Sequence, residues 1–307
     1  MPHSRRTILA ATLGLAALAT RSAAASPAIV TEGGGADAGE AFAARTLDGL
    51  TLSGRLYGDP AHPEILLIHG LGQSRLSWER QTGSALTQRF RVVTYDFRGH
   101  GDSDKPDDIA AYADGGRWAD DVAAVIAASG LRRPVLVGWS LGGFAIGHYL
   151  ARHGQAKIAG VNLVNAVTRL APELLTATAR DYAIRLASPD LGVRTQAIEG
   201  FLAVCFAKPP APEAFRRMLV FNGMVPRAVQ QGIVRMASEG LDQAFAATAR
   251  LLVTYGAKDA LTSRPMSQRV LALNAAARLS LYEDAGHTPF YEEPERFNAE
   301  LAAFAAG

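Results

Sequence analysis

The sequence predicts an α/β protein: a mostly parallel, doubly wound sheet with helices on both faces and a helical insertion. Three observations support this prediction. Short apolar runs rich in β-favouring residues alternate with segments of helical spacing, which is the pattern of a parallel sheet covered on both faces. The alternation stops between residues 169 and 250, where prolines interrupt helical segments, and then resumes. A chain of 307 residues is long enough to bury one large core of this kind.

The first 25 residues have the features of an export signal. Arg5 and Arg6 precede an apolar run over residues 8–19, and the small residues Ala23-Ala24-Ala25 follow it, as in signals that are cleaved. The run is shorter than the roughly 20 residues that span a bilayer, so we expect no membrane span in the mature protein. The arginine pair is typical of the twin-arginine route, and an ordinary secretory signal is the alternative. We therefore expect a periplasmic or secreted protein, with residues 26–41 as a flexible lead-in.

The core is expected to comprise residues 42–168 and 251–307. A hairpin is predicted around Asp48-Gly49, a pair that favours tight turns between strands. Each further strand is an apolar run bounded by turn residues. The expected strands are residues 42–47, 51–57, 65–68, 91–95, 135–138, 158–164, 251–255 and 278–282. The expected helices cover residues 78–86, a segment ending at Gly130, a segment ending near Leu150, and residues 265–273 and 294–305.

Composition excludes several classes of function. The formal net charge is only +2, so the chain lacks the basic excess of a nucleic-acid-binding protein. Cys205 is the single cysteine; it cannot form an internal disulfide and is interpreted as a buried structural thiol. The sequence shows no metal-ligand spacing, no dinucleotide-binding fingerprint and no phosphate-binding loop. We therefore expect neither a metal nor another cofactor.

A serine motif, Gly138-Trp139-Ser140-Leu141-Gly142, lies between an expected strand and an expected helix. In that context G-x-S-x-G forms a sharp turn that aims the serine hydroxyl away from the sheet. The neighbouring positions must be glycine because a Cβ would clash in so tight a turn. A serine hydroxyl is a weak nucleophile until a base takes its proton, and the base must be oriented by an acid. The motif therefore predicts a nucleophile if a base and an acid can be found.

Suitable residues follow the serine in the order Asp, His. Asp259 comes directly after the expected strand 251–255, and His287 follows the expected strand 278–282. Because the carboxyl ends of parallel strands meet at one edge of the sheet, these side chains and Ser140 are expected to lie together. The loop after the preceding strand offers Asn165 and no carboxylate, so the acid is assigned to Asp259.

Other polar residues near these motifs are interpreted as structural. Asp96 and His100 are expected to hold their loop by hydrogen bonds, and His69 to shape the loop in which it lies. Glu292 and Glu293, just beyond the histidine, are interpreted as a solvated approach to the last helix.

Taken together, the motifs resemble the α/β-hydrolase superfamily, close to its lipase/esterase-like and cofactor-free, haloperoxidase-like branch. The segments HGLG, DFRGHGDS, GWSLGG, YGAKD and GHTPFYEEP occur in family order between about residues 42 and 306. The resemblance implies the α/β-hydrolase fold, and it implies that residues 169–250 form a helical cap over the active site.

The resemblance also implies a role for each site residue. Ser140 would be the nucleophile, His287 the general base and Asp259 its orienting acid. The backbone N–H groups of Leu71 and Leu141 would form the oxyanion hole. Such donors matter because they bind negative charge that develops only in the transition state.

The cap is expected to supply apolar surface that holds the acyl group of a substrate. Candidate residues with large apolar side chains are Phe201, Phe206, Met218, Phe221 and Met224. Of these, Phe206, Phe221 and Met224 are predicted to bind substrate. Trp139, beside the serine, either borders the same pocket or packs under the cap.

The function predicted from these residues is cofactor-free hydrolysis of a small-molecule carboxylic ester through an acyl-enzyme. Perhydrolysis by the same three residues, the activity of non-heme haloperoxidases, is the alternative within this machinery. A hypothesis from a different class of function is a small-molecule receptor that retains the three residues. Multiple turnover of activated esters would separate an enzyme from a receptor.

Overall fold

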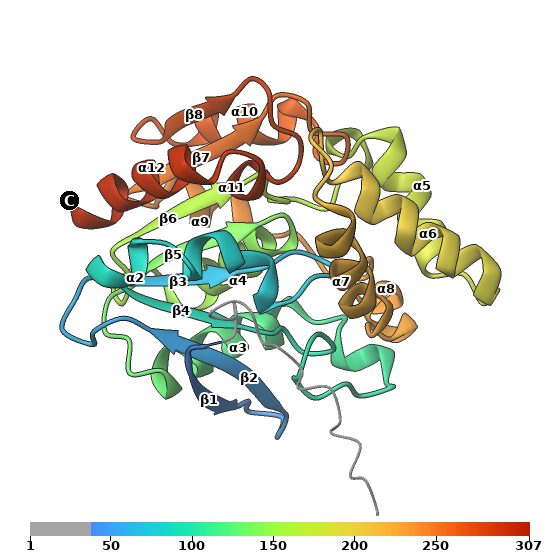
Figure 1. The fold of residues 1–307 in the computed structure, drawn as a ribbon, viewed down its shortest axis with the longest axis horizontal. Helices are drawn as coiled ribbons and strands as arrows, with labels where there is room; N and C mark the ends of the chain where they lie inside the picture. Colours follow the sequence, from blue (N-terminus) through green and yellow to red (C-terminus); the bar gives the residue numbers. More distant parts are fainter. Residues whose placement is uncertain (1–37) are drawn as a thin grey trace, which may run out of the picture. The chain divides into compact units, whose positions relative to one another are not determined.

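The computed structural model describes residues 38–307 (Figure 1). The export signal expected over residues 1–25 lies outside the described residues, as does the lead-in up to residue 37. Among the helices that the structure describes, none combines the length and the apolar character needed to cross a bilayer.

An eight-stranded sheet forms the centre of the described chain. Its strands are β1 (Glu40–Arg45), β2 (Thr51–Tyr57), β3 (Glu64–Ile68), β4 (Arg91–Tyr95), β5 (Val135–Trp139), β6 (Gly160–Val164), β7 (Leu251–Gly256) and β8 (Arg278–Tyr282). They lie in the order β1-β2-β4-β3-β5-β6-β7-β8. The hairpin β1–β2 and the pair β2–β4 are antiparallel, whereas all pairs from β4 to β8 are parallel. This sheet confirms the predicted fold class.

The helices that cover the sheet bury two separate apolar clusters, one on each face. The side-chain alternation of β3 shows the division: Leu66 and Ile68 enter one cluster, and Ile65 and Leu67 the other, as the two-residue period of a strand requires. The first cluster is covered by α3 (Gly115–Ala128), α4 (Leu141–His153) and α10 (Arg264–Leu273). The second is covered by α2 (Leu86–Arg89), α11 (Pro289–Glu292) and α12 (Pro294–Ala306).

The predicted helix over residues 78–86 is broken into shorter pieces. The structure has a 3-10 turn over Arg75–Trp78, then α1 (Glu79–Thr82), and only afterwards α2. Gly83 ends α1, and glycine is unfavourable in a helix interior because it loses the most conformational freedom on folding. The remaining expected helices lie within a few residues of their predicted bounds.

Residues 169–250, called the insertion below, contain helices and no sheet strand. The helices are α5 (Ala177–Leu186), α6 (Leu191–Val204), α7 (Pro212–Gly223), α8 (Arg227–Ile233) and α9 (Leu241–Ala246). Figure 1 shows α5 to α8 together at one end of the strands. The insertion contacts both apolar clusters: Val229 and Phe245 enter the first, and Leu202 and Phe221 the second. The insertion therefore packs against apolar side chains from both faces of the sheet.

Candidate active site

Ser140 occupies the turn between β5 and α4 in a strained backbone conformation. Its φ is 53° and its ψ is −117°, a region that residues with a Cβ adopt rarely and at a cost of about 1–3 kcal/mol. The surrounding chain holds this geometry. The amide of Ser140 donates to Val164 O at 3.0 Å, and its carbonyl accepts from the amides of Gly143 and Val167 at 3.0 and 2.9 Å.

Close packing explains the glycines of the motif. A Cβ built on Gly142 would lie 2.5 Å from Ile68 O, and one built on Gly138 would lie 2.7 Å from the backbone of Gly142. Real Cβ atoms do not approach that closely, so a larger residue would push α4 away from β3 and β5. The glycines thus allow the strand, the turn and the helix to meet in the space available.

His287 follows β8 in a loop that fixes both its backbone and its ring. Its amide donates to Cys205 O at 3.0 Å, and its carbonyl accepts from Trp139 Nε1 at 2.8 Å. The ring is almost fully buried, and its Nδ1 lies 2.8 Å from Asp259 Oδ2. The other ring nitrogen, Nε2, is buried and has no hydrogen-bond partner among the described residues.

Asp259, in the loop after β7, accepts five hydrogen bonds. Oδ2 accepts from His287 Nδ1, from Asn165 Nδ2 at 2.6 Å and from the hydroxyl of Thr262. Oδ1 accepts from the amides of Leu261 and Thr262 at 2.7 and 3.1 Å. The contributions of Asn165 and Thr262 were not predicted. The sequence gives no sign of either contact. In the case of Asn165, the bond joins two loops that lie more than 90 residues apart.

These contacts determine the charge of Asp259 and the tautomer of His287. Burial alone would raise the pKa of Asp259, but the interaction with His287 and the hydrogen bonds from His287, Thr262 and Asn165 together lower it below its ordinary value. Asp259 is therefore an ionised acceptor, and His287 Nδ1 must carry the proton that is shared with it. In the neutral ring Nε2 is then left with a free lone pair, which is the state of a general base.

Two buried histidines, His69 and His100, form hydrogen bonds to the loop after β3, which carries Leu71. His69 Nδ1 donates to Gly70 O at 2.8 Å, and its Nε2 accepts from the amide of Phe97 at 3.0 Å. His100 Nε2 accepts from the amide of Gly72 at 3.2 Å. Burial lowers the pKa of both histidines to about 3, so both are neutral acceptors at physiological pH. Their interpretation as structural residues agrees with these bonds, as does that of Asp96, which accepts from the amides of Arg75 and Asp102.

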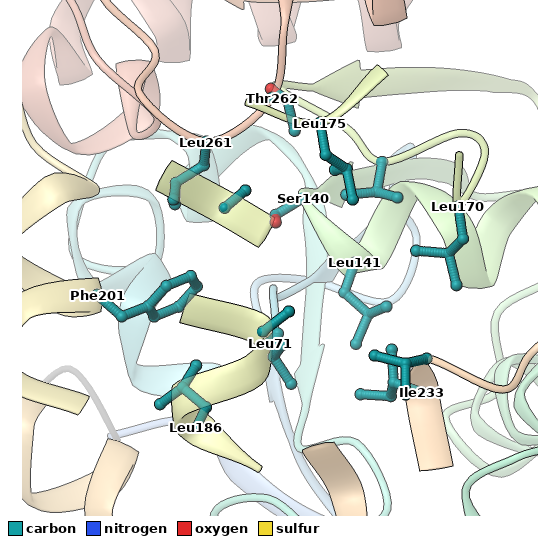
Figure 2. Close-up of a pocket in the computed structure, with 14 residues that line it drawn as sticks. Leu71, Ser140, Leu141, Leu170, Leu175, Leu186, Phe201, Ile233, Leu261 and Thr262 are labelled. Atoms are coloured by element: carbon teal, nitrogen blue, oxygen red, sulfur yellow. The ribbon is translucent and has the colours of Figure 1, made fainter. Parts of the chain in front are cut away.

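An apolar cavity of about 110 Å³ opens beside Ser140 (Figure 2). Leu71 and Leu141, the two predicted oxyanion-hole residues, both line it. Neither backbone N–H of this pair has a partner among the hydrogen bonds of the described chain. In Figure 2 the Ser140 hydroxyl lies among the surrounding apolar side chains. The further lining residues are Val167, Leu170, Leu175, Ala179, Ala183, Leu186, Phe201, Ile233, Val234, Leu261 and Thr262.

The three residues predicted to bind substrate and Trp139, the fourth candidate, lie elsewhere; none of them lines this cavity. Trp139 packs in the second apolar cluster, with its ring centroid 4.9 Å from that of Phe290 and 5.7 Å from that of His287. Phe206 packs against Tyr291, and Phe221 is buried in the second cluster. Met224 is 46% exposed at the end of α7. The prediction rested on residue size, whereas the direction of each side chain decides which residues reach the cavity.

The described residues include no group of histidine, cysteine or acidic side chains that could hold a metal ion. Cys205 is buried, its Sγ donates to Phe201 O at 3.3 Å, and burial raises its pKa. It is therefore a packed thiol, as the sequence indicated.

Comparison with known proteins identifies relatives of this chain. Residues 65–300 match the model of the alpha/beta hydrolase family. The chain is 30% identical over 263 residues to a pimeloyl-[acyl-carrier protein] methyl ester esterase from Neisseria meningitidis serogroup B / serotype 15 (strain H44/76), covering 80% of this chain and 93% of that protein.

Two solved structures are also similar. A putative aryl esterase from Burkholderia cenocepacia is 38% identical, with a TM-score of 0.84 over 87% of this chain and 98% of that one. A bromoperoxidase from Bacillus anthracis is 18% identical, with a TM-score of 0.77 over 87% of this chain and 100% of that one. At that identity the second likeness concerns the fold alone.

Proposed function

This chain belongs to the alpha/beta hydrolase family, and from that premise we propose that it hydrolyses carboxylic esters through an acyl-enzyme on Ser140. The observation that carries the proposal is the buried pair of Asp259 and His287, whose Nδ1 and Oδ2 atoms lie 2.8 Å apart while Nε2 remains free. A histidine in this state can accept a proton at Nε2 from a hydroxyl group and later donate it again. The esterase relatives support the same class of reaction.

In the first half of the proposed reaction, His287 Nε2 takes the proton of Ser140 as Oγ bonds to the ester carbonyl carbon. The carbonyl oxygen becomes an oxyanion, and the backbone N–H groups of Leu71 and Leu141 stabilise its charge. When the tetrahedral intermediate collapses, the bond from carbon to the leaving oxygen breaks. The proton on Nε2 passes to that oxygen, and an alcohol departs.

In the second half, a water molecule replaces the alcohol. His287 Nε2 takes a proton from the water as its oxygen bonds to the acyl carbon. Collapse of this intermediate breaks the bond to Ser140 Oγ, which regains its proton from Nε2, and a carboxylic acid is released. Throughout, the ionised Asp259 stabilises the positive charge of the protonated imidazole.

The cavity indicates which acyl groups fit. Its lining is apolar apart from Ser140 and Thr262, so it favours an uncharged group. A cavity of about 150 Å³ lined by Leu, Ile and Phe is known to hold a benzene ring, and the cavity here measures about 110 Å³. We therefore propose that the enzyme prefers short acyl groups to long chains.

Replacement of the nucleophile tests the proposal. Ser140→Ala should lower kcat for a p-nitrophenyl acetate substrate by at least about 10⁴-fold, because the acyl-enzyme cannot form. A fluorophosphonate should add one covalent label to the wild type, located by mass spectrometry on the peptide that contains Ser140.

The matched control is Ser129→Ala. Ser129 and Ser140 are each 8% exposed, but the hydroxyl of Ser129 donates to Val125 O at the end of α3, away from the cavity. This variant should keep full activity and full labelling. Undiminished turnover by Ser140→Ala, or a label on another residue, would reject the assignment.

A further inference from the structure

Glu292 joins the loop that carries His287 to the connection between α6 and α7. Its Oε1 accepts from the amide of Gly286 at 2.8 Å and from the hydroxyl of Thr288 at 3.0 Å. Its Oε2 accepts from the amides of Lys208 and Ala207 at 2.8 and 3.0 Å. The first two donors flank His287, and the other two lie in the connection between α6 and α7. The interpretation of Glu292 as a solvated residue is therefore wrong, because four hydrogen bonds hold its carboxylate.

The two segments that Glu292 joins are already in contact. The amide of His287 donates to Cys205 O at 3.0 Å, and the Thr288 hydroxyl, whose single proton is shared with Glu292, lies 3.3 Å from the same carbonyl oxygen. A Cβ added at Gly286 would lie 2.7 Å from the amide nitrogen of Ala207, so the backbones approach each other directly. At this junction the loop that carries His287 and the end of α6 form one hydrogen-bonded unit.

We propose that Glu292 is a positioning residue for the ester hydrolysis: it holds the His287 loop against residues 205–208 of the insertion and thereby fixes where Nε2 lies. The inference rests on the proposed function, since it assigns His287 the proton transfer. His287 Nδ1 is held by Asp259, but the backbone that carries the ring is held on one side by the core and on the other by the insertion. Glu292 strengthens the support from the insertion by accepting two hydrogen bonds from each segment.

The chemistry of the side chain explains why a carboxylate is needed. All four partners are donors, and an ionised carboxylate is acceptor-only on both oxygens. A glutamine has nearly the same shape, but its NH₂ group would face two N–H or O–H donors and leave that pair unsatisfied. An aspartate is one methylene shorter and cannot span the two segments. Glu292→Gln therefore breaks one arm of the bridge while changing the volume very little.

The first experiment compares Glu292→Gln with Glu293→Gln, which makes the same charge change one residue away. Within the part of the chain that the structure describes, the Glu293 carboxylate forms only long ion pairs, with Lys208 at 3.7 Å and Arg296 at 3.8 Å. Active sites are counted with the fluorophosphonate, so that loss of folded protein does not mimic loss of catalysis. Per labelled site, Glu292→Gln should lower kcat by about 10- to 100-fold, as small displacements of catalytic groups do. The KM for the acetate ester should change less than about 3-fold, and Glu293→Gln should match the wild type.

The second measurement does not depend on activity. Amide hydrogen exchange of intact wild type and Glu292→Gln should differ at Gly286, Ala207 and Lys208, with faster exchange in the variant. A smaller change, Thr288→Val, removes one of the four donors and should lower kcat per site by a smaller factor. This variant keeps the test open if Glu292→Gln folds poorly.

An unchanged kcat per labelled site in Glu292→Gln would overturn the proposal, as would an equal loss in Glu293→Gln. Unchanged exchange at all three amides would also overturn it. Failure of the proposed function is a separate result: the wild type would then carry no fluorophosphonate label on Ser140, whatever the exchange rates at the junction.

Discussion

The loops at the carboxyl ends of the strands and the insertion are built in different ways. In the loops, backbone strain and hydrogen bonds determine the geometry. Ser140 and Asn165, the described non-glycine residues with positive φ, both lie there, and Asp259 alone accepts five hydrogen bonds. In the insertion, apolar side chains dominate, and many of them are not buried. Of the nine large apolar side chains that are exposed in residues 38–307, six lie in the insertion: Ile184, Leu191, Val193, Val220, Met224 and Val234.

This difference separates the chemistry from the choice of substrate. The residues proposed to react are held by directional bonds, so they tolerate little displacement. Most of the cavity wall comes from side chains of the insertion and its flanking loops, such as Ala183, Leu186 and Ile233, and apolar contacts of this kind can repack when a residue changes. Substitutions in the loops should therefore change kcat, and substitutions in the insertion should change which esters bind.

The largest effect that tests this separation is expected from Asp259→Asn. The amide would favour the wrong tautomer of His287, so kcat should fall by about 10⁴-fold while the protein stays folded. Turnover of an acetate ester and the circular dichroism spectrum would be measured together. The matched control is Asp242→Asn in the insertion, where the carboxylate pairs with Arg169 and Arg269. Its kcat should remain within about 2-fold, and an equal loss in both variants would contradict the comparison.

An intermediate effect is expected from acid pH, and it should originate in the core, because the insertion contains no histidine. The folded-state pKa of both His69 and His100 is about 3, lowered by burial from an ordinary value of 6.5. Between these values the unfolded chain binds protons that the folded chain does not. The free energy of unfolding should therefore be largest above pH 6.5 and fall as the pH drops towards 3.

At pH 5 the two histidines together should lower the free energy of unfolding by up to about 4 kcal/mol relative to pH 7. Urea unfolding at the two pH values measures this difference. His100→Gln should make the dependence shallower, since one of the two groups is removed. A pH dependence that is identical in the wild type and in His100→Gln would exclude this origin.

The smallest effect is expected in the insertion. Phe201→Ala enlarges the cavity, so the ratio of kcat/KM for hexanoate and acetate esters should rise by about 10-fold, as one or two methylenes in an apolar pocket can give. Phe206→Ala is the control, because Phe206 packs on Tyr291 and does not line the cavity. If Phe206→Ala shifted the ratio as much as Phe201→Ala, the cavity beside Ser140 would not be the acyl site.

The sheet and the positions of the candidate site residues could be predicted from the sequence because local rules determine them. Apolar runs bounded by turn residues predicted β2, β4 and β8 at their observed bounds. The glycines around Ser140 indicated a turn too tight for a Cβ, and the parallel topology then required Asp259 and His287 to approach each other. Each of these inferences uses neighbours in the chain or the geometry of a parallel sheet.

Only the tertiary structure decided which side chains surround those residues. The sequence left Trp139 either at the pocket or in packing, and the pleat of β5 turns it towards Phe290, so it packs. Asn165 bonds to Asp259, and Glu292 to Ala207 and Lys208, across gaps of more than 80 residues, and no local pattern marks such bonds. In α6 apolar residues occur around the helix, so periodicity could not indicate that Phe201 faces the cavity while Leu202 is buried in the second cluster. A helix of this composition takes its orientation from what it packs against, and that is a property of the folded chain alone.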